Sequence, residues 1–142
     1  MIKNTIVVNR PIEIVFDYAS HFERHPEWQP DLKAAEFQGP AQVGAAGSET
    51  RQMGRRVQTY QWRVSECEPP HRLGFETTSG PMRPAGTMAF RSEGEGTRVD
   101  FEMALNPRGW MKLLAPIIER QVQKTNTEHL GLFKQRLEAD GS

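Results

Sequence analysis

The sequence predicts an α+β protein in which a curved antiparallel sheet of six to seven strands packs around one long C-terminal helix. Three observations predict this class. The last part of the chain has a helical period, the middle is a run of alternating strands, and two short helical segments follow the first strand. Antiparallel strands with helices covering one face form one of the stable layer arrangements of proteins.

The long helix is predicted within residues 107–138, and we expect it to cover at least 117–137. Its core-facing stripe contains residues that recur at helical spacing: Ile118, Val122, His129 and Phe133. Pro116 suits the first turn of a helix and would break an interior turn. We therefore expect a short helical piece over 108–114, a kink or restart, and then the long helix.

The strands are predicted from the alternation of apolar and polar side chains. The first, Ile2–Val8, is predicted instead from its many β-branched residues. Pro11 then starts a short helix, and a second short helix is expected before Pro26. Six further strands are expected near 32–37, 48–53, 57–66, 73–78, 87–92 and 99–105. Most of these strands have one apolar and one polar face, which predicts an antiparallel meander with one face in water.

The strand at 48–53 leaves one question open, because polar residues occupy both of its faces. Glu49 and Arg51 share one face with Met53, and Thr50 and Gln52 share the other. Alternation does not decide which face is inward. An inward Glu49 or Arg51 would favour an enzyme, since elsewhere few carboxylates or bases are expected to point inward.

Composition narrows the possible functions. The 142 residues suffice for one domain, expected over 1–139, with a frayed tail at 140–142. Lys plus Arg equals Asp plus Glu at 18 each, so the net charge gives no reason to expect nucleic acid or an anionic membrane as partner. No run approaches the length of a membrane span, and no signal peptide precedes the first strand, so we expect a cytoplasmic protein.

The sequence predicts neither a metal site nor a cofactor. Cys67 is the single cysteine, and we interpret it as a small apolar residue of a strand. No group of Cys and His residues has the spacing of a zinc site. His21 and His25 have the i, i+4 spacing that can bind a metal on a helix, but no third ligand is nearby. We therefore expect surface or capping roles for both histidines.

Local signals in a fixed order point to a known family. They lie at residues 10–16, 28–30, 43–44, 66–73, 96–99 and 132–134. Together with the order of elements, they resemble the Bet v 1/START-like (SRPBCC) superfamily, and most closely its bacterial polyketide cyclase/dehydrase-like branch. The resemblance implies the helix-grip fold, with a cavity between the curled sheet and the long helix that is suited to an apolar small molecule. It does not imply one activity.

The candidate site follows from this cavity. His129 and Tyr60 are the candidate catalytic groups. The candidate ligand-binding residues are Asn126, Leu130, Trp62, Phe75, Met88, Phe90, Phe101 and Trp110. The entrance is expected near the loop at 80–86 or near Trp110. For His129 the alternative is a core histidine that bonds a neighbouring strand, and for the aromatic residues the alternative is dry core.

Three functions remain open. The first is binding of an apolar small molecule that is polyketide-, lipid- or aromatic-like. The second is an enzyme of the polyketide cyclase/dehydratase type that acts on a poly-carbonyl substrate in the same cavity, with His129 or Tyr60 transferring protons. The third is a protein-interaction module that grips an apolar segment of a partner. The sequence names no ligand and assigns no oligomeric state.

Overall fold

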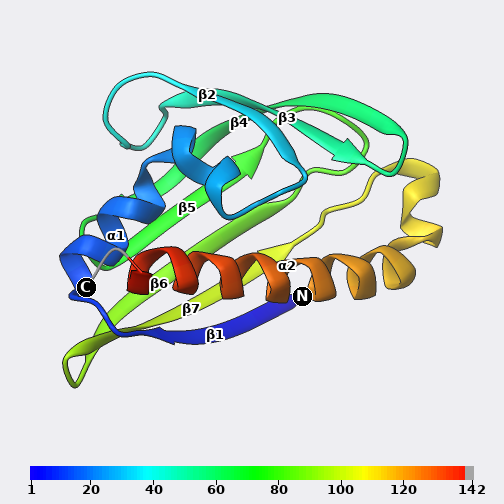
Figure 1. Cartoon of the computed structure of the whole chain (residues 1–142). Coiled ribbons are helices and arrows are strands. Elements are labelled where there is room, and N and C mark those ends of the chain that lie inside the picture. Colours follow the sequence, from blue (N-terminus) through cyan, green and yellow to red (C-terminus); the bar gives the residue numbers. More distant parts are fainter. Residues whose placement is uncertain (140–142) are drawn as a thin grey trace.

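The computed structural model describes residues 1–139, apart from the side chain of Met53 (Figure 1). The expected tail at 140–142 lies outside the described residues. The strands form one antiparallel sheet in the order β1-β7-β6-β5-β4-β3-β2. They are β1 (Ile2–Val8), β2 (Leu32–Phe37), β3 (Ala46–Met53), β4 (Arg56–Glu68), β5 (Arg72–Thr77), β6 (Ala85–Glu93) and β7 (Gly96–Ala104). All seven expected strands are present, with ends that differ by a few residues.

Two helical segments lie between β1 and β2, and two follow β7. They are α1 (Ile12–Ser20), the 3-10 helix η1 (Phe22–Glu27), the 3-10 helix η2 (Gly109–Leu113) and α2 (Ala115–Ala139). The restart near Pro116 is confirmed, because α2 begins one residue before this proline. In Figure 1, α2 runs along one face of the sheet, and α1 and η1 lie at one end of the same face. The expected helix-grip architecture is therefore confirmed.

The last turns of α2 are anchored in the core through Phe133 and Leu137. Phe133 is fully buried, with its ring centroid 5.5 Å from that of Tyr18 and 5.0 Å from that of Trp28. The expectation that Phe133 and Val122 are both buried holds only for Phe133. Val122 is partly buried, because it lies where the helix spans a cavity.

Polar contacts between α2 and β1 hold the N-terminal half of the helix over the sheet. Asn4 Oδ1 accepts hydrogen bonds from Asn126 Nδ2 at 2.9 Å and from Gln123 Nε2 at 3.1 Å. Asn4 Nδ2 donates to Thr127 Oγ1 at 2.9 Å. These hydrogen bonds therefore position this part of the helix on the sheet, where apolar packing is incomplete. Within residues 1–139, no helix has both the length and the apolar character to span a membrane.

Candidate functional site

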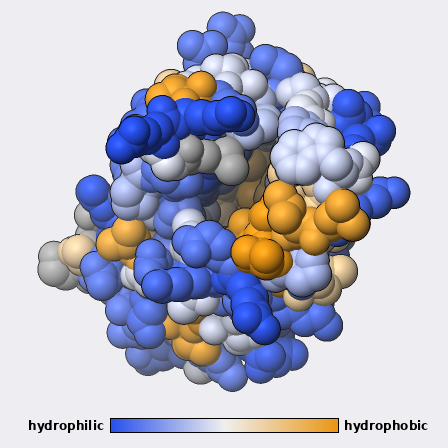
Figure 2. Space-filling model, turned by 90° about the vertical axis from the view of Figure 1, so that its right-hand side faces the viewer, coloured by the Kyte–Doolittle hydropathy of each residue, from blue (hydrophilic) through white to orange (hydrophobic). Residues whose placement is uncertain are grey.

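A cavity of about 660 Å³ lies between the sheet and the part of α2 that runs from Ile118 to Leu132. Its mouth is bounded by the turn between β3 and β4, the loop between β5 and β6, and the start of α2, through Gln52, Gly54, Met82, Pro84, Ile118 and Gln121. Figure 2 faces this end of the molecule and shows the hollow. The expected cavity beside His129 is present, and of the two places expected for its entrance, the loop at 80–86 contributes lining residues whereas Trp110 does not.

Most of the wall is apolar and comes from the inward faces of four strands and α2. The strands contribute Tyr60 and Trp62 from β4, Phe75 from β5, Met88 from β6, and Phe101 and Met103 from β7. Two close approaches shape this wall. A Cβ on Gly47 would lie 2.7 Å from the Trp62 ring, and a Cβ on Gly86 would lie 2.8 Å from the Phe75 ring. Glycine at both positions lets the aromatic rings lie flat against the neighbouring strand.

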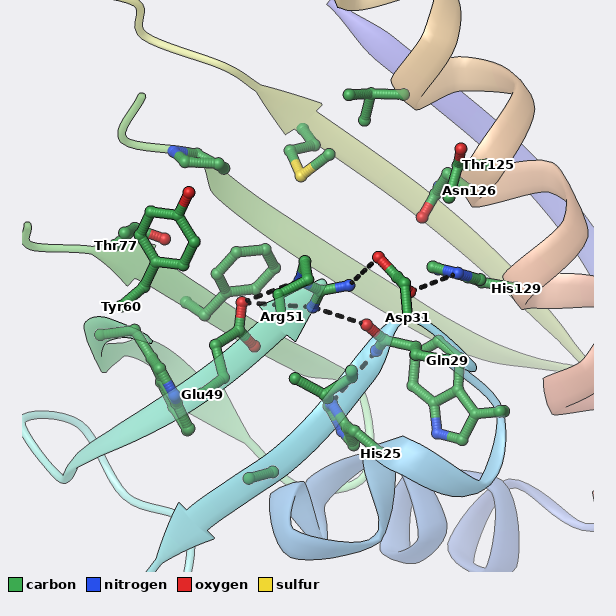
Figure 3. Close-up of a pocket in the computed structure, with 18 of the residues that line it drawn as sticks. His25, Gln29, Asp31, Glu49, Arg51, Tyr60, Thr77, Thr125, Asn126 and His129 are labelled. Carbon is green, nitrogen blue, oxygen red and sulfur yellow. Dashed lines mark hydrogen bonds and ion pairs between the residues drawn. The ribbon is translucent and has the colours of Figure 1, made fainter. Parts of the chain in front are cut away.

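A cluster of polar side chains occupies the β2–β3 side of the cavity (Figure 3). Asp31, just before β2, lies between α2 and β3. Its Oδ1 is 2.9 Å from His129 Nε2, and its Oδ2 accepts a 3.0 Å hydrogen bond from Arg51 Nη1. Arg51 Nη2 donates to Gln29 Oε1 at 2.8 Å and to Glu49 Oε1 at 3.2 Å. The cluster thus joins three separate parts of the chain.

The His129–Asp31 contact is close but poorly directed. Asp31 Oδ1 is buried and, among the described residues, accepts no hydrogen bond of good geometry. Burial raises the pKa of Asp31, but the contact with His129 and the charge of Arg51 outweigh burial and hold this pKa well below its usual range. Asp31 is therefore ionised at neutral pH. Arg51 also loses solvation by burial, but the charges of Glu49 and Asp31 raise its pKa.

His25 borders the same cavity, so of the surface or capping roles expected for it only capping fits, through a carbonyl in the last turn of α1. Its Nε2 lies 2.8 Å from the carbonyl oxygen of Ala19, and its Nδ1 lies 3.4 Å from Gln29 Nε2. Burial lowers the pKa of His25 to about 4, and the charge of Arg51 adds to this effect. His25 is therefore neutral at physiological pH. His21 is exposed, and the described residues contain no cluster of three His, Cys, Asp or Glu side chains that would hold a metal.

Tyr60 reaches the cavity from the mouth side. Its hydroxyl donates to Gln58 Oε1, and burial raises the pKa of the phenol. Gly80, with φ +89°, lies against this ring, since a Cβ there would be 3.1 Å from Tyr60 Cε1. The loop between β5 and β6 therefore helps to fix the orientation of Tyr60.

The structure brings together most of the residues that the sequence singles out. His129, Tyr60, Asn126, Trp62, Phe75, Met88 and Phe101 all line the cavity. Asn126 lines it while its amide donates to Asn4, so part of its role is structural.

Three of the expected ligand-binding residues do not line the cavity. Leu130, on α2, is buried in the hydrophobic core. Phe90 belongs to the dry core, where its ring meets that of Phe16 with centroids 5.3 Å apart. Trp110 is 68% exposed, because η2 lies outside the mouth.

The polar cluster is what reasoning from the sequence misses. The expectation that few ionisable groups point inward is wrong, because Asp31, Glu49, Arg51 and His25 all border the cavity. β3 places the face that carries Glu49 and Arg51 inward, which settles the question that alternation leaves open. Asp31 lies in the connection before β2, where no period marks the direction of a side chain. The alternation of charges at Glu49 and Arg51 is the one signal that points toward the cluster.

Comparison with known proteins identifies relatives. Residues 2–138 match a family model described as polyketide cyclase / dehydrase and lipid transport. No curated protein sequence matches this chain. The crystal structure of TTHA0849 from Thermus thermophilus is similar, with 20% identity, a TM-score of 0.79 and 99% of each chain covered.

Two further structures come from proteins named as aromatase/cyclase or ARO/CYC. The Zhui aromatase/cyclase from Streptomyces sp. R1128 has 10% identity and a TM-score of 0.80, over 99% of this chain and 94% of that one. The di-domain ARO/CYC StfQ from the steffimycin biosynthetic pathway has 18% identity and a TM-score of 0.77, over 99% of this chain and 46% of its own. The chain thus spans about half the length of StfQ. At these identities the similarity to solved structures shows the fold alone.

The family match is of a different kind, since it covers nearly the whole sequence. It agrees with the local signals along the chain and with the sheet that grips α2. The chain therefore belongs to the polyketide cyclase/dehydrase and lipid transport family.

Proposed function

We propose that this protein binds an uncharged, largely apolar small molecule that carries hydroxyl or carbonyl oxygens. The observation that supports this most directly is a 660 Å³ cavity with apolar walls and one polar side. Ligand pockets of this size combine apolar lining with a few placed polar groups. Here the apolar strand faces would bury the body of the ligand, and the cluster around Asp31 and Arg51 would orient its oxygens.

The charge of the lining supports an uncharged ligand. Histidines aside, Arg51 is the single cation among the described lining residues, against the carboxylates of Asp31, Glu49 and Glu128. Arg51 already donates hydrogen bonds to two of these carboxylates and to Gln29. A ligand carboxylate or phosphate would therefore meet negative charge and find no unpaired cation in the described lining. Burial of an unpaired charge is costly.

Two fluorescent probes with a shared skeleton test this proposal. N-phenyl-1-naphthylamine is uncharged, and 8-anilinonaphthalene-1-sulfonate adds one sulfonate. We expect the uncharged probe to bind at least about tenfold more tightly, a difference of roughly 1.4 kcal/mol. Tighter binding of the sulfonate would contradict the uncharged ligand class.

Adjacent threonines supply a matched pair of variants. Thr77 lines the cavity, whereas Thr78 is exposed and does not line it. Thr77→Trp should fill part of the cavity and weaken probe binding at least about tenfold, and Thr78→Trp should leave it unchanged. Equal affinity in both variants would place the probe elsewhere and remove the cavity as the binding site. If the cavity variant weakens binding as expected, native mass spectrometry of gently purified protein is the next step, to identify a bound natural ligand.

A second function, a cyclase/dehydratase acting on a poly-carbonyl chain, is favoured by the His129–Asp31 contact. An imidazole beside an ionised carboxylate is suited to accept a proton from a carbon between two carbonyls. The resulting enolate would attack another carbonyl of the same chain. Turnover of a poly-β-ketone thioester should fall at least about 100-fold in His129→Ala while probe affinity stays within a few-fold. Absence of turnover in the unaltered protein would leave binding alone as the function.

A further inference from the structure

Large apolar side chains stand in solvent beside the cavity mouth. Trp110, Leu113 and Ile117 are 68%, 84% and 69% exposed, and Leu114 is 40% exposed. η2 buries none of its residues. We call these four residues the mouth patch. Figure 2 shows hydrophobic side chains gathered next to the hollow. Scattered apolar residues are common on protein surfaces, but a contiguous group of this kind marks an interaction site.

Three segments that reach the same end of the molecule contain no acidic residues. The segments 50–65, 77–92 and 103–118 contain no Asp or Glu, and they include the β3–β4 turn, the β5–β6 loop and η2. Backbone hydrogen bonds join two of these segments, from Arg108 N to Pro81 O at 3.0 Å and from Arg83 N to Leu105 O at 3.1 Å.

Exposed cations accompany the mouth patch at this end. Arg55, Arg56, Arg108 and Lys112 lie in these segments, and Arg120 lies just past them, next to Glu119. Among the ion pairs of the described residues, none involves these five side chains. The nearest carboxylate in sequence, Glu119, contacts Met1 at the start of β1 instead. A chain with zero net charge thus has a cationic, apolar end.

We infer that this end docks on the surface of an anionic lipid bilayer. The mouth patch would enter the boundary between head groups and acyl chains, and the surrounding Arg and Lys side chains would contact lipid phosphates. A bilayer offers both an apolar phase for Leu113 and Ile117 and negative charge for Arg108 and Lys112. Trp110 has the amphipathic ring that is enriched at membrane interfaces. The cavity mouth would then face the lipid.

The bilayer fits these observations better than a protein partner does. Interfaces between proteins commonly pair charges of both signs around their core. The described residues of the mouth segments supply cations without a compensating carboxylate. The docking does not depend on which ligand the cavity holds, so it is tested with the protein alone.

The experiment measures partitioning of the whole chain onto vesicles. Vesicles of phosphatidylcholine are compared with vesicles that contain about 30% phosphatidylglycerol, a fraction in the range of anionic biological membranes. Trp28 and Trp62 are 3% and 7% exposed, so a blue shift of tryptophan fluorescence reports Trp110. We expect partitioning at least about tenfold stronger onto the anionic vesicles, and weaker partitioning as salt rises.

Two double variants separate the apolar and the electrostatic contributions. Leu113→Ser with Ile117→Ser, and Arg108→Glu with Lys112→Glu, should each reduce partitioning at least about tenfold. All four positions are exposed, so each variant is expected to keep the unfolding midpoint of the unaltered protein. That midpoint is measured alongside.

Matched controls change the same residue types on other surfaces. Val7→Ser with Val43→Ser removes apolar side chains that are 43% and 65% exposed. Lys33→Glu with Arg91→Glu reverses two exposed cations. Both controls should partition as the unaltered protein does. The inference is overturned if anionic vesicles do not bind the protein, if the control pairs weaken binding as much as the mouth pairs, or if the mouth patch instead mediates self-association or binding to an acidic protein.

Discussion

Asp31 is the residue on which the polar side of the cavity depends. It is the only described side chain that contacts both His129 of α2 and Arg51 of β3. Its side chain is 31% exposed and that of Arg51 is 21% exposed, so solvent screens this pair less than it screens the surface pairs. Loss of one partner would leave a partly buried charge without compensation, which costs more than loss of an exposed pair.

A double-mutant cycle measures this contact. We expect Asp31→Asn and Arg51→Met to couple by about 1–3 kcal/mol in the free energy of unfolding, obtained from urea titrations. The Arg98–Asp100 pair is the control, because its side chains are 35% and 37% exposed at a similar 3.2 Å separation. Its coupling should stay below about 1 kcal/mol. Equal coupling in both cycles would mean that the cavity does not strengthen the Asp31–Arg51 pair.

His25 should make stability depend on pH. Its pKa is about 4 in the folded protein against 6.5 for an ordinary histidine, so the unfolded chain binds more protons between these values. The free energy of unfolding is therefore unaffected by the titration of His25 above about pH 6.5. It falls by up to roughly 3 kcal/mol as the pH decreases from 6.5 to about 4. The depressed pKa of Asp31 means that its contribution is lost only at lower pH.

Unfolding titrations from pH 7 to pH 4 check the effect of His25. His25→Gln should flatten the dependence, since glutamine can still donate to the Ala19 carbonyl but does not titrate. His71→Gln, at an exposed turn position, should keep the full slope. An unchanged slope in His25→Gln would assign the dependence to other groups.

At the scale of elements, α2 combines two different environments. Its last turns contribute Phe133 and Leu137 to the core, whereas the stretch from Ile118 to Leu132 crosses the cavity. The same face of α2 therefore packs in the core at one end and lines the cavity at the other. The contacts with Asn4 on β1 allow this division, because they hold the cavity half by polar bonds.

Alanine substitutions should reveal the two environments in urea titrations. Phe133→Ala removes a fully buried ring and should cost about 3–5 kcal/mol in the free energy of unfolding. Val122→Ala should cost no more than about 1 kcal/mol, because one side of Val122 already lacks packing partners. A cost for Val122→Ala near that of a fully buried valine would show that the cavity is filled by neighbouring side chains.

At the scale of the whole molecule, we expect local stability to be lowest around the cavity. The mouth loops and the first turns of α2 border empty space, while α1, η1 and the end of α2 close the opposite end with aromatic contacts. Segments with few buried apolar contacts open at lower free energy than the core does.

Amide hydrogen exchange should report this gradient. Residues 115–125 should exchange faster than 130–137, and saturation with the uncharged naphthylamine probe should slow exchange mainly in 115–125, as ligand stabilises the bound segment. Thr77→Trp serves as the control in which the probe slows exchange little. Uniform slowing along α2 would indicate that the ligand stabilises the protein globally instead of filling the cavity.

The sequence by itself determined the fold. Alternation located most of the strands and β-branched residues located the first, Pro116 marked the start of α2, and the stripe through Phe133 identified the helix face that meets the sheet. These features are local or periodic, so they can be read without knowledge of distant contacts. The same stripe located His129 on the cavity, and the apolar strand faces located most of its wall.

The tertiary structure alone decided the polar side of the cavity and the distribution of charge. Alternation tells which residues of β3 share a face but not which face turns inward, and Asp31 lies where no period exists. Trp110 and Phe90 are both aromatic, as pocket walls often are. In the structure, however, η2 leaves Trp110 in solvent, and Phe16 of α1 packs on Phe90. A balance of 18 cations and 18 anions predicts no electrostatic partner, but folding brings acid-free segments to one end of the molecule. Contacts between residues far apart in sequence depend on register and on loop direction, and neither is set by local propensity.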